Sequence, residues 1–417
     1  MAGKRAVDQD GAQQVPSKKL KPAPAKSRFW DLDQSLDDAA ARDLRRLRGK
    51  VGVSAPTVEE EACRARTVQF LRKTYAKLCQ KHQLKAASPV FFDKWHCAWL
   101  CHAELSLGPG NRDPLLPVIE DFAVLDAAMV KALAFLPKEK VAPMARDLHR
   151  VAERKAKALP EKLLQLPTGG HATVVQQGKE VTLSFQGQEV QISSWHLRKL
   201  WRLFRGPEEA FSDAAFCCLL RYQSVLQKGF QGACTSEVFE ALRETFGCRF
   251  ECFASPLNCH YRWTCSAFLD TDAPFGSLGS FFLQEFRSGA FQLNPPFVDD
   301  LVIPMVQKLE DCLVAAEAAK SALTFVVVVC ANAGSRSGKA ALEAIGASRF
   351  LRAQVTCPRN THEYVDGEQH VNKMIRGSPC ESGIFILQSR RAAKTNAATE
   401  EKMQRIKASF MGVDGKT

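Results

Sequence analysis

Residues 289–300 read GAFQLNPPFVDD, and this stretch decides how the second half of the chain is interpreted. An apolar run ends at Asn294, two prolines follow, and Phe297 stands before two aspartates. Each proline fixes its own φ and biases the residue before it away from the helical region. The pattern predicts a strand that ends at Asn294, a rigid turn, and a helix that begins near Asp299. The turn either only ends the strand or holds a ligand.

Strands and helices alternate on both sides of this turn, which predicts an α/β domain with a largely parallel sheet over residues 210–395. The run 325–329, FVVVV, is apolar on both faces, as expected of a central strand buried between helices. In open α/β sheets, ligands bind beyond the carboxyl ends of the strands. The candidate loops there are 255–258, 294–297 and 331–338.

The first half of the chain has a different pattern. Residues 28–209 predict a mainly helical domain with a small β-hairpin or meander over 171–192, where apolar residues alternate around Gly-containing turns. Thr57 and Glu60 have the spacing of a capping box at a helix start. Residues 1–27 predict a disordered basic tail, and residues 396–417 predict a C-terminal helix or tail.

The net charge limits the classes of partner. The chain has 417 residues, a formal charge of +12 and a pI near 9.0, which favours a polyanion but does not separate nucleic acid from an anionic membrane surface. No apolar run is long enough to cross a membrane, so no membrane association through a span is expected. The start of the chain lacks the apolar centre of a signal peptide, so the fifteen cysteines are interpreted as free thiols. Lys4-Arg5 and residues 18–21, KKLK, resemble a bipartite nuclear import signal, and a simple basic tail is the alternative.

The residue types of the turn indicate a chemistry. An asparagine oxygen and a fixed proline carbonyl are two acceptors, and the exocyclic amine of adenine offers two donor hydrogens. Such a pair would align the nitrogen lone pair toward an electrophile, and an aromatic ring beside it would stack on the base. We therefore expect Asn294, Pro295, Pro296 and Phe297 to be the catalytic loop of an enzyme that methylates an amino group.

Asn-Pro-Pro-Phe resembles the catalytic motif of S-adenosylmethionine-dependent methyltransferases that act on adenine N6 or on a glutamine amide. The longer blocks 238–279, 289–297 and 348–370 resemble, more specifically, the phosphorylated CTD-interacting factor family of cap-specific mRNA adenosine N6-methyltransferases. The resemblance implies a class I (Rossmann-like) methyltransferase core beside the helical domain, with S-adenosylmethionine as cofactor. It also implies a capped mRNA 5′ end as substrate, with methylation of N6 on the (2′-O-methyl)adenosine next to the cap, and a location in the nucleus.

The resemblance also implies site residues. Cofactor contacts are expected after the first strand, near the glycine turn that follows, and around the catalytic loop, from Ala254, Ser255, Pro256, Asn258, Phe275, Gly276, Asn294 and Asp299. The segment 362–370 matches the family, so substrate contacts are expected from His362, Tyr364, Gln369 and His370. Independently of the resemblance, the helix at 195–205 is interpreted as amphipathic and packed through its apolar side, and its basic residues Arg198, Lys199 and Arg202 are expected to face RNA phosphate.

Several features limit this interpretation. Vertebrate members of the family carry a WW domain for the polymerase tail, which the 27-residue tail and Trp30 cannot form, so no WW-mediated polymerase contact is predicted. Cys97 and Cys101 lie one helical turn apart, but no second pair with metal spacing accompanies them, so no metal is expected. The alternatives are adenine N6 methylation of internal RNA or DNA, and an RNA-binding relative without catalysis.

Overall fold

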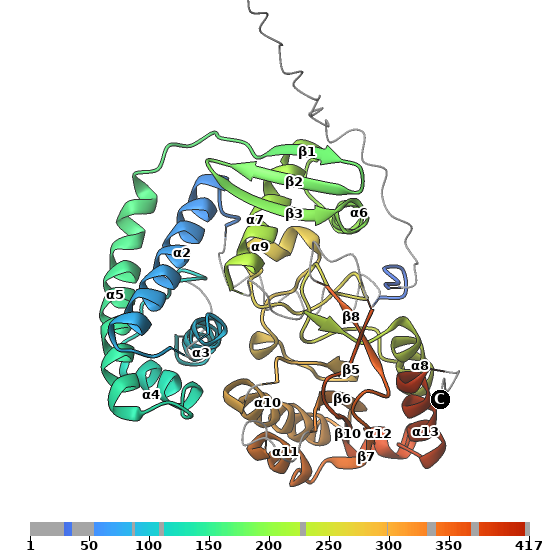
Figure 1. The fold of residues 1–417 in the computed structure, drawn as a ribbon. Helices are drawn as coiled ribbons and strands as arrows, with labels where there is room; N and C mark the ends of the chain where they lie inside the picture. Colours follow the sequence, from blue (N-terminus) through green and yellow to red (C-terminus); the bar gives the residue numbers. More distant parts are fainter. Residues whose placement is uncertain are drawn as a thin grey trace, which may run out of the picture.

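The computed structural model describes residues 29–35, 54–85, 88–107, 112–225, 231–297, 299–331, 339–367 and 375–412 (Figure 1). A helical region comes first along the chain and stands beside a lobe built on a mixed sheet (Figure 1). The long helices of the helical region are α2 (Val58–Lys81), α3 (Val90–Leu107), α4 (Ala123–Ala132), α5 (Lys138–Leu164), α6 (Ser194–Leu203) and α7 (Phe211–Val225). No helix within the described residues is long and apolar enough to span a bilayer.

Local sequence signals explain how this region starts and turns. Thr57 caps α2 as predicted, because the N–H of Glu60 donates to Thr57 Oγ1 and the N–H of Thr57 donates to Glu60 Oε2. The predicted meander is confirmed as an antiparallel three-stranded sheet in the order β1–β2–β3. Its strands are β1 (Thr173–Gln177), β2 (Glu180–Phe185) and β3 (Gln188–Ser193).

The second lobe contains a four-stranded sheet in the order β5–β6–β10–β7. Its strands are β5 (Gly289–Leu293), β6 (Leu323–Cys330), β10 (Ser382–Gln388) and β7 (Leu351–Cys357). β5 and β6 are parallel, but β10 is antiparallel to both of its neighbours. The prediction of a largely parallel sheet is therefore wrong for this strand. No helix lies between β7 and β10 in the described residues, and without a crossover the chain returns antiparallel.

Helices cover both faces of this sheet. Alternate residues of β6 contribute to two cores: Phe325 and Val327 pack on the side of α10 (Asp299–Ala318) and α11 (Lys339–Gly346). Val326 and Val328 pack on the side of α8 (Ser236–Phe246) and α13 (Glu400–Met411). The prediction of a strand buried on both faces is confirmed.

Smaller elements complete the described fold. A second three-stranded sheet has the order β4–β8–β9. Its strands and the remaining helical turns are β4 (Gly232–Ala233), β8 (Glu363–Asp366), β9 (Ile375–Gly377), α9 (Leu269–Asp272), α12 (Arg390–Thr395), η2 (Glu208–Ala210), η3 (Ala273–Phe275) and η4 (Phe281–Leu283).

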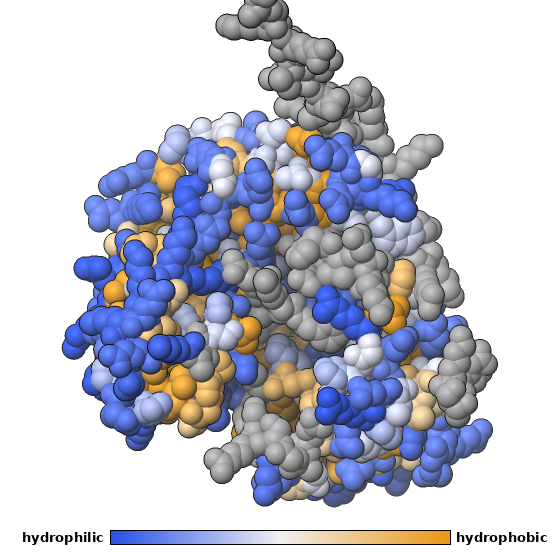
Figure 2. Space-filling view, in the orientation of Figure 1, coloured by the Kyte–Doolittle hydropathy of each residue, from blue (hydrophilic) through white to orange (hydrophobic). Residues whose placement is uncertain are grey.

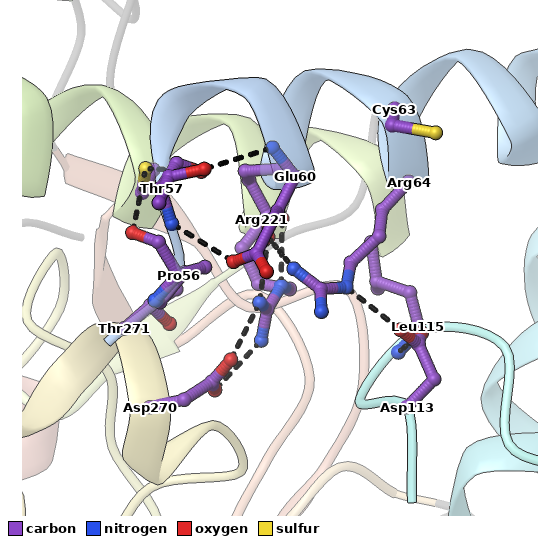
Figure 3. Close-up of polar contacts among 12 residues, drawn as sticks. Pro56, Thr57, Glu60, Cys63, Arg64, Asp113, Leu115, Arg221, Asp270 and Thr271 are labelled. Atoms are coloured by element: carbon purple, nitrogen blue, oxygen red, sulfur yellow. Dashed lines mark hydrogen bonds and ion pairs between the residues drawn. The ribbon is translucent and has the colours of Figure 1, made fainter. Parts of the chain in front are cut away.

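A buried ion cluster joins the helical region to the sheet lobe (Figure 3). Arg221 of α7 is fully buried and makes paired bonds of 2.7 Å to both carboxylate oxygens of Glu61 in α2. It also bonds both oxygens of Asp270 in α9, at 2.8 and 2.7 Å. α7 shares a core with α2, so the helical packing continues past the domain boundary expected at residue 210. The division into domains stays a prediction.

Candidate active site

The Asn-Pro-Pro-Phe loop leaves the sheet where its strand order reverses. Glu251 forms parallel bridges with Gln292 of β5 on one side and with Thr264 on the other, and Thr264 bridges Ser277 in turn. The segments at Thr264 and Ser277 therefore lie on one side of Glu251, and β5, which comes later in the chain, lies on the other side. At such a reversal a crevice lies beyond the carboxyl ends of the adjacent strands, and ligands of α/β proteins bind there.

Asn294 follows β5 directly at this reversal, and its side-chain amide has a defined orientation. Its Nδ2 donates to the carbonyl oxygen of Gly232, at 3.1 Å. A carbonyl can only accept, so the amide nitrogen must be the atom that faces it. The Oδ1 atom is buried and has no hydrogen-bond partner among the residues that the structure describes. A buried acceptor without a partner is costly, so this oxygen is suited to receive a donor from a ligand.

The rest of the loop is rigid and then opens to solvent. Pro295 is buried and Pro296 is exposed. Phe297 leaves 39% of its surface accessible, which is unusual for phenylalanine and leaves ring area for stacking. The helix α10 begins at Asp299, in agreement with the predicted helix start.

Hydrogen bonds from its own side chains hold the loop 254–258, which follows Glu251, in one conformation. The N–H of Ser255 donates to Asn258 Oδ1 at 2.7 Å, and the N–H of Asn258 donates to Ser255 Oγ at 3.3 Å. Ser255 Oγ also donates to Gln231 Oε1, at 3.0 Å. Ala254 and Pro256 lie in this same loop, which therefore has a fixed shape at the edge of the crevice.

The two loops meet at one backbone carbonyl. Gly232 O accepts Asn258 Nδ2 at 3.4 Å as well as Asn294 Nδ2. Gly367, at the end of β8, packs so closely on the loop that a Cβ there would lie 2.5 Å from the Cβ of Asn258. The structure thus brings together Asn258 and Asn294, two residues that the sequence analysis assigned to the site.

Lys199 lies beneath the same loop instead of on a basic surface. Its Nζ donates to the carbonyl oxygen of Leu257 at 2.9 Å and lies 5.2 Å from the ring centre of Trp30. Only 2% of Lys199 is accessible, so its expected contact with RNA phosphate is wrong. Its neighbours Arg198 and Arg202 on α6 remain partly exposed.

His362 and Tyr364 also point inward, which contradicts their assignment as substrate contacts. His362 Nε2 and the Tyr364 hydroxyl lie 2.7 and 2.6 Å from Ser382 Oγ, and all three side chains are buried. Desolvation by burial lowers the pKa of His362. The backbone of the matched segment still reaches the site through Gly367. Gln369 and His370 lie outside the described residues.

Phe275 and Gly276 lie toward the opposite end of the sheet from Asn294. Ser277 is level with Gln292 through the chain of parallel bridges, so the residues just before it lie at the amino ends of the strands. Phe275 packs against Phe204 with ring centres 5.6 Å apart. Gly276 has φ +104°, and a Cβ there would lie 2.2 Å from Arg262 O. This pair shapes a turn, and the structure does not bring it to the crevice.

Sequence reasoning missed Gly232 and Glu251, two residues that fix the backbone and side chains around the candidate site. Gly232 belongs to a two-residue strand, which is too short to give any periodic pattern. Glu251 is fully buried and accepts the N–H groups of His260 and Tyr261 at 2.7 and 3.0 Å. Burial raises the pKa of Glu251 to about 7, while these two N–H donors oppose the rise. A lone Glu inside an apolar strand was the one signal that could have indicated this role.

Cys97 and Cys101, which were considered for metal binding, are free thiols. Burial raises the pKa values of Cys97 and Cys101 to about 12. Within the described ranges, no group of three or more His, Cys, Asp or Glu side chains is arranged to hold a metal ion.

The fold and the loop define the chain as a mixed α/β protein whose candidate ligand site is a rigid Asn-Pro-Pro-Phe turn at a strand-order reversal. Residues 196–367 match the family described as "Phosphorylated CTD interacting factor 1 WW domain". The matched residues run from α6 to the end of β8, so they contain the crevice and exclude the β1–β3 sheet.

Two curated relatives share this similarity. The human and mouse proteins named mRNA (2'-O-methyladenosine-N(6)-)-methyltransferase are 36% and 35% identical to this chain over 245 residues. The similarity covers 55% of this chain and 34% of each relative, so the match spans about a third of the length of those proteins. The resemblance to the phosphorylated CTD-interacting factor family is therefore confirmed over this part of the chain.

Proposed function

We propose that this chain is an S-adenosylmethionine-dependent enzyme that methylates N6 of the (2′-O-methyl)adenosine next to the cap of mRNA. The human and mouse relatives are named as methyltransferases that act on N6 of 2′-O-methyladenosine in mRNA. The single observation that carries the proposal is the buried Oδ1 of Asn294 at the strand-order reversal, for which the described part of the chain offers no hydrogen-bond partner.

The chain's own residues would act mainly by orientation. Asn294 Oδ1 accepts one hydrogen of the adenine amino group, and a carbonyl of the fixed Pro295-Pro296 turn accepts the other. The bond from Asn294 Nδ2 to Gly232 O keeps the amide from rotating away. Phe297 stacks on the base. These contacts hold the nitrogen lone pair in one direction, and orientation of this kind lowers the barrier without a strong base.

We infer that the cofactor binds at the same strand-order reversal. When bound, S-adenosylmethionine supplies a methyl group on a sulfonium, which is the electrophile for the amine. The loop 254–258 and Asn294 would hold it, because they lie at the edge of the crevice and share the carbonyl of Gly232. Asp299 begins the helix that follows and is a further candidate contact.

We also propose that the sheet is that of a class I, Rossmann-like methyltransferase. Support comes from the order 277, 264, 251, β5, β6, which reverses between Glu251 and β5 as in doubly wound nucleotide-binding folds. The sheet differs from an all-parallel doubly wound sheet at β10, which is antiparallel to β6.

Methyl transfer to three matched substrates tests the proposal. We expect transfer to RNA that starts with capped 2′-O-methyladenosine, and much weaker transfer to the same RNA without a cap and to single-stranded DNA. Equal rates on capped and uncapped RNA would favour internal-RNA methylation instead. Absence of S-adenosylmethionine binding in calorimetry would contradict catalysis and favour an RNA-binding protein.

Lys199→Met tests the support of the cofactor loop. The change leaves the buried carbonyl of Leu257 without its hydrogen-bond donor, which costs about 1–3 kcal/mol. The loop 254–258 can avoid this cost only by moving. We expect binding of S-adenosylmethionine to weaken about tenfold, with a smaller change in the rate at saturating cofactor. Calorimetry and steady-state kinetics measure the two effects, and the exposed Lys179→Met is the matched control. Unchanged cofactor affinity would show that Lys199 only fills the core.

The cellular location completes the proposal. The protein would act in the nucleus. The two basic clusters at residues 4–5 and 18–21 support nuclear import, although they lie outside the described residues. Nuclear accumulation of a fluorescent fusion, before and after the lysines and the arginine of both clusters are changed to alanine, checks this point.

A further inference from the structure

The helices α2 and α5 together present a strongly basic surface. The two helices run antiparallel and side by side, because Lys81 Nζ lies 2.9 Å from Asp147 Oδ2 and Lys155 Nζ lies 4.5 Å from the centre of the Phe70 ring. Hydrophilic side chains cover this edge of the molecule over both helices (Figure 2). We call the exposed cations there the α2–α5 face: Lys73, Lys77, Lys81, Arg146, Arg150, Arg154 and Lys157.

The cations form two rows with matched spacing. On α2 they recur every four residues, at 73, 77 and 81, and on α5 they recur at 146, 150 and 154. Four residues of α-helix rise by about 6 Å, and each step returns nearly to the same side. From the two contacts that join the helices, Lys77 lies level with Arg150, and Lys73 lies level with Arg154. The result is a continuous cationic strip.

Few acidic groups neutralise this strip. α5 contains eight Lys or Arg residues and four Asp or Glu residues. Asp147 pairs with Lys81 and Arg150, and Glu153 pairs with Lys157. In the part of the chain that the structure describes, no carboxylate lies within ion-pair distance of Lys73, Lys77, Arg146 or Arg154. Cations left in this way attract a polyanion and release its counterions on binding.

An exposed aromatic ring lies inside the strip. Phe70 leaves 44% of its surface accessible on the outer side of α2, next to Lys73. Core packing does not explain a phenylalanine at such a position. An aromatic ring between cations is the usual arrangement for single-stranded nucleic acid, since bases stack on the ring while phosphates contact the charges.

We propose that the α2–α5 face binds the phosphate backbone of the transcript beyond the nucleotide that is methylated, with Phe70 stacking on one base. The inference rests on the proposed RNA substrate. The face lies outside residues 196–367, so the family match does not cover it. α3 packs against α10, the helix that follows the Asn-Pro-Pro-Phe loop, and this contact holds the helical region beside the crevice. The α2–α5 face would therefore contribute to binding of a long transcript but not of a short capped fragment.

Charge reversal at Arg150→Glu with Arg154→Glu tests this proposal. The KM for a capped transcript of several tens of nucleotides is expected to rise about tenfold or more, while kcat/KM on a capped dinucleotide stays unchanged. The slope of log affinity against log salt should become shallower by about 1.4 for two lost phosphate contacts on single-stranded RNA. Arg391→Glu with Lys394→Glu on α12 makes the same charge change at exposed positions and serves as the control.

Binding of the same RNA is measured by fluorescence anisotropy, which needs no catalysis. If neither the wild type nor any variant methylates RNA, the proposed function fails. The salt dependence of binding measured by anisotropy then still tests whether the α2–α5 face binds RNA. Phe70→Ala should weaken binding of single-stranded RNA more than binding of a duplex. Equal affinity and equal salt slope in the wild type and the Arg150/Arg154 variant overturn the proposal. Loss of binding to anionic vesicles, with RNA binding retained, overturns it in favour of a membrane surface.

Discussion

Asn294→Ala is expected to lower the rate of methyl transfer by about a hundredfold or more, because a small misplacement of a reacting group has an effect of that size. The alanine removes the only side-chain acceptor of the catalytic loop and also the bond to Gly232 O that orients it. Single-turnover transfer from labelled S-adenosylmethionine to capped RNA measures the loss. The fold should survive, since one partly buried hydrogen bond contributes about 1 kcal/mol.

Two further variants separate the roles of this side chain. Asn294→Asp keeps an acceptor but turns an oxygen toward the carbonyl of Gly232, so we expect an activity between those of the wild type and the alanine variant. Gln307→Ala removes an amide from the exposed surface of α10 and should change nothing. A rate for Asn294→Ala within a few-fold of the wild type would contradict the assignment of this loop as catalytic.

The elements that sequence predicted correctly are those whose signal is local. The capping box at Thr57 involves residues three apart, the meander alternates within single strands, and β6 is apolar over its whole length. The antiparallel placement of β10 could not be predicted in this way. Ser382–Gln388 is buried throughout and reads like a parallel central strand. Its direction is set by the connection that precedes it, which contains β8 and β9 and no described helix.

The same limit applies to the site. Asn294, Pro295, Pro296 and Phe297 were recognisable because the motif is contiguous. Lys199 was misplaced because its charge suggested a solvent-facing side, whereas its nitrogen reaches a carbonyl 58 residues away. Gly232, which orients Asn294, is 62 residues from it in the chain. A contact of that range leaves no mark on the sequence near either residue.

Arg221→Met is expected to destabilise the protein by about 3–5 kcal/mol, because Asp270 loses its ion-pair partner and Glu61 keeps only the longer contact with Arg64, at 3.6 Å. Arg221 is fully buried, and its guanidinium forms paired bonds to Glu61 and Asp270 (Figure 3). Methionine has a similar length, so the change removes charge and hydrogen bonds more than volume. Urea unfolding at pH 7 measures the loss. Arg243→Met is the matched control, because Arg243 also contacts two carboxylates but at 3.4 Å and partly exposed, where pairs contribute less than about 1 kcal/mol.

The pH dependence of this loss identifies its cause. Burial raises the pKa of Asp270, but the charge and hydrogen bonds of Arg221 outweigh that effect, and the pKa lies below its usual value. A lowered folded-state pKa means that the wild type is stabilised above the unfolded pKa and loses this contribution only as the pH falls through the folded pKa. In the methionine variant burial is opposed only by the smaller effects of the Arg64 charge and the Thr271 N–H, so we expect Asp270 to take up a proton at higher pH, where its neutral form is easier to bury. The stability deficit of Arg221→Met should therefore shrink between pH 7 and about pH 5. A deficit that stays constant over this range would show that lost packing, and not the unpaired charge, destabilises the variant.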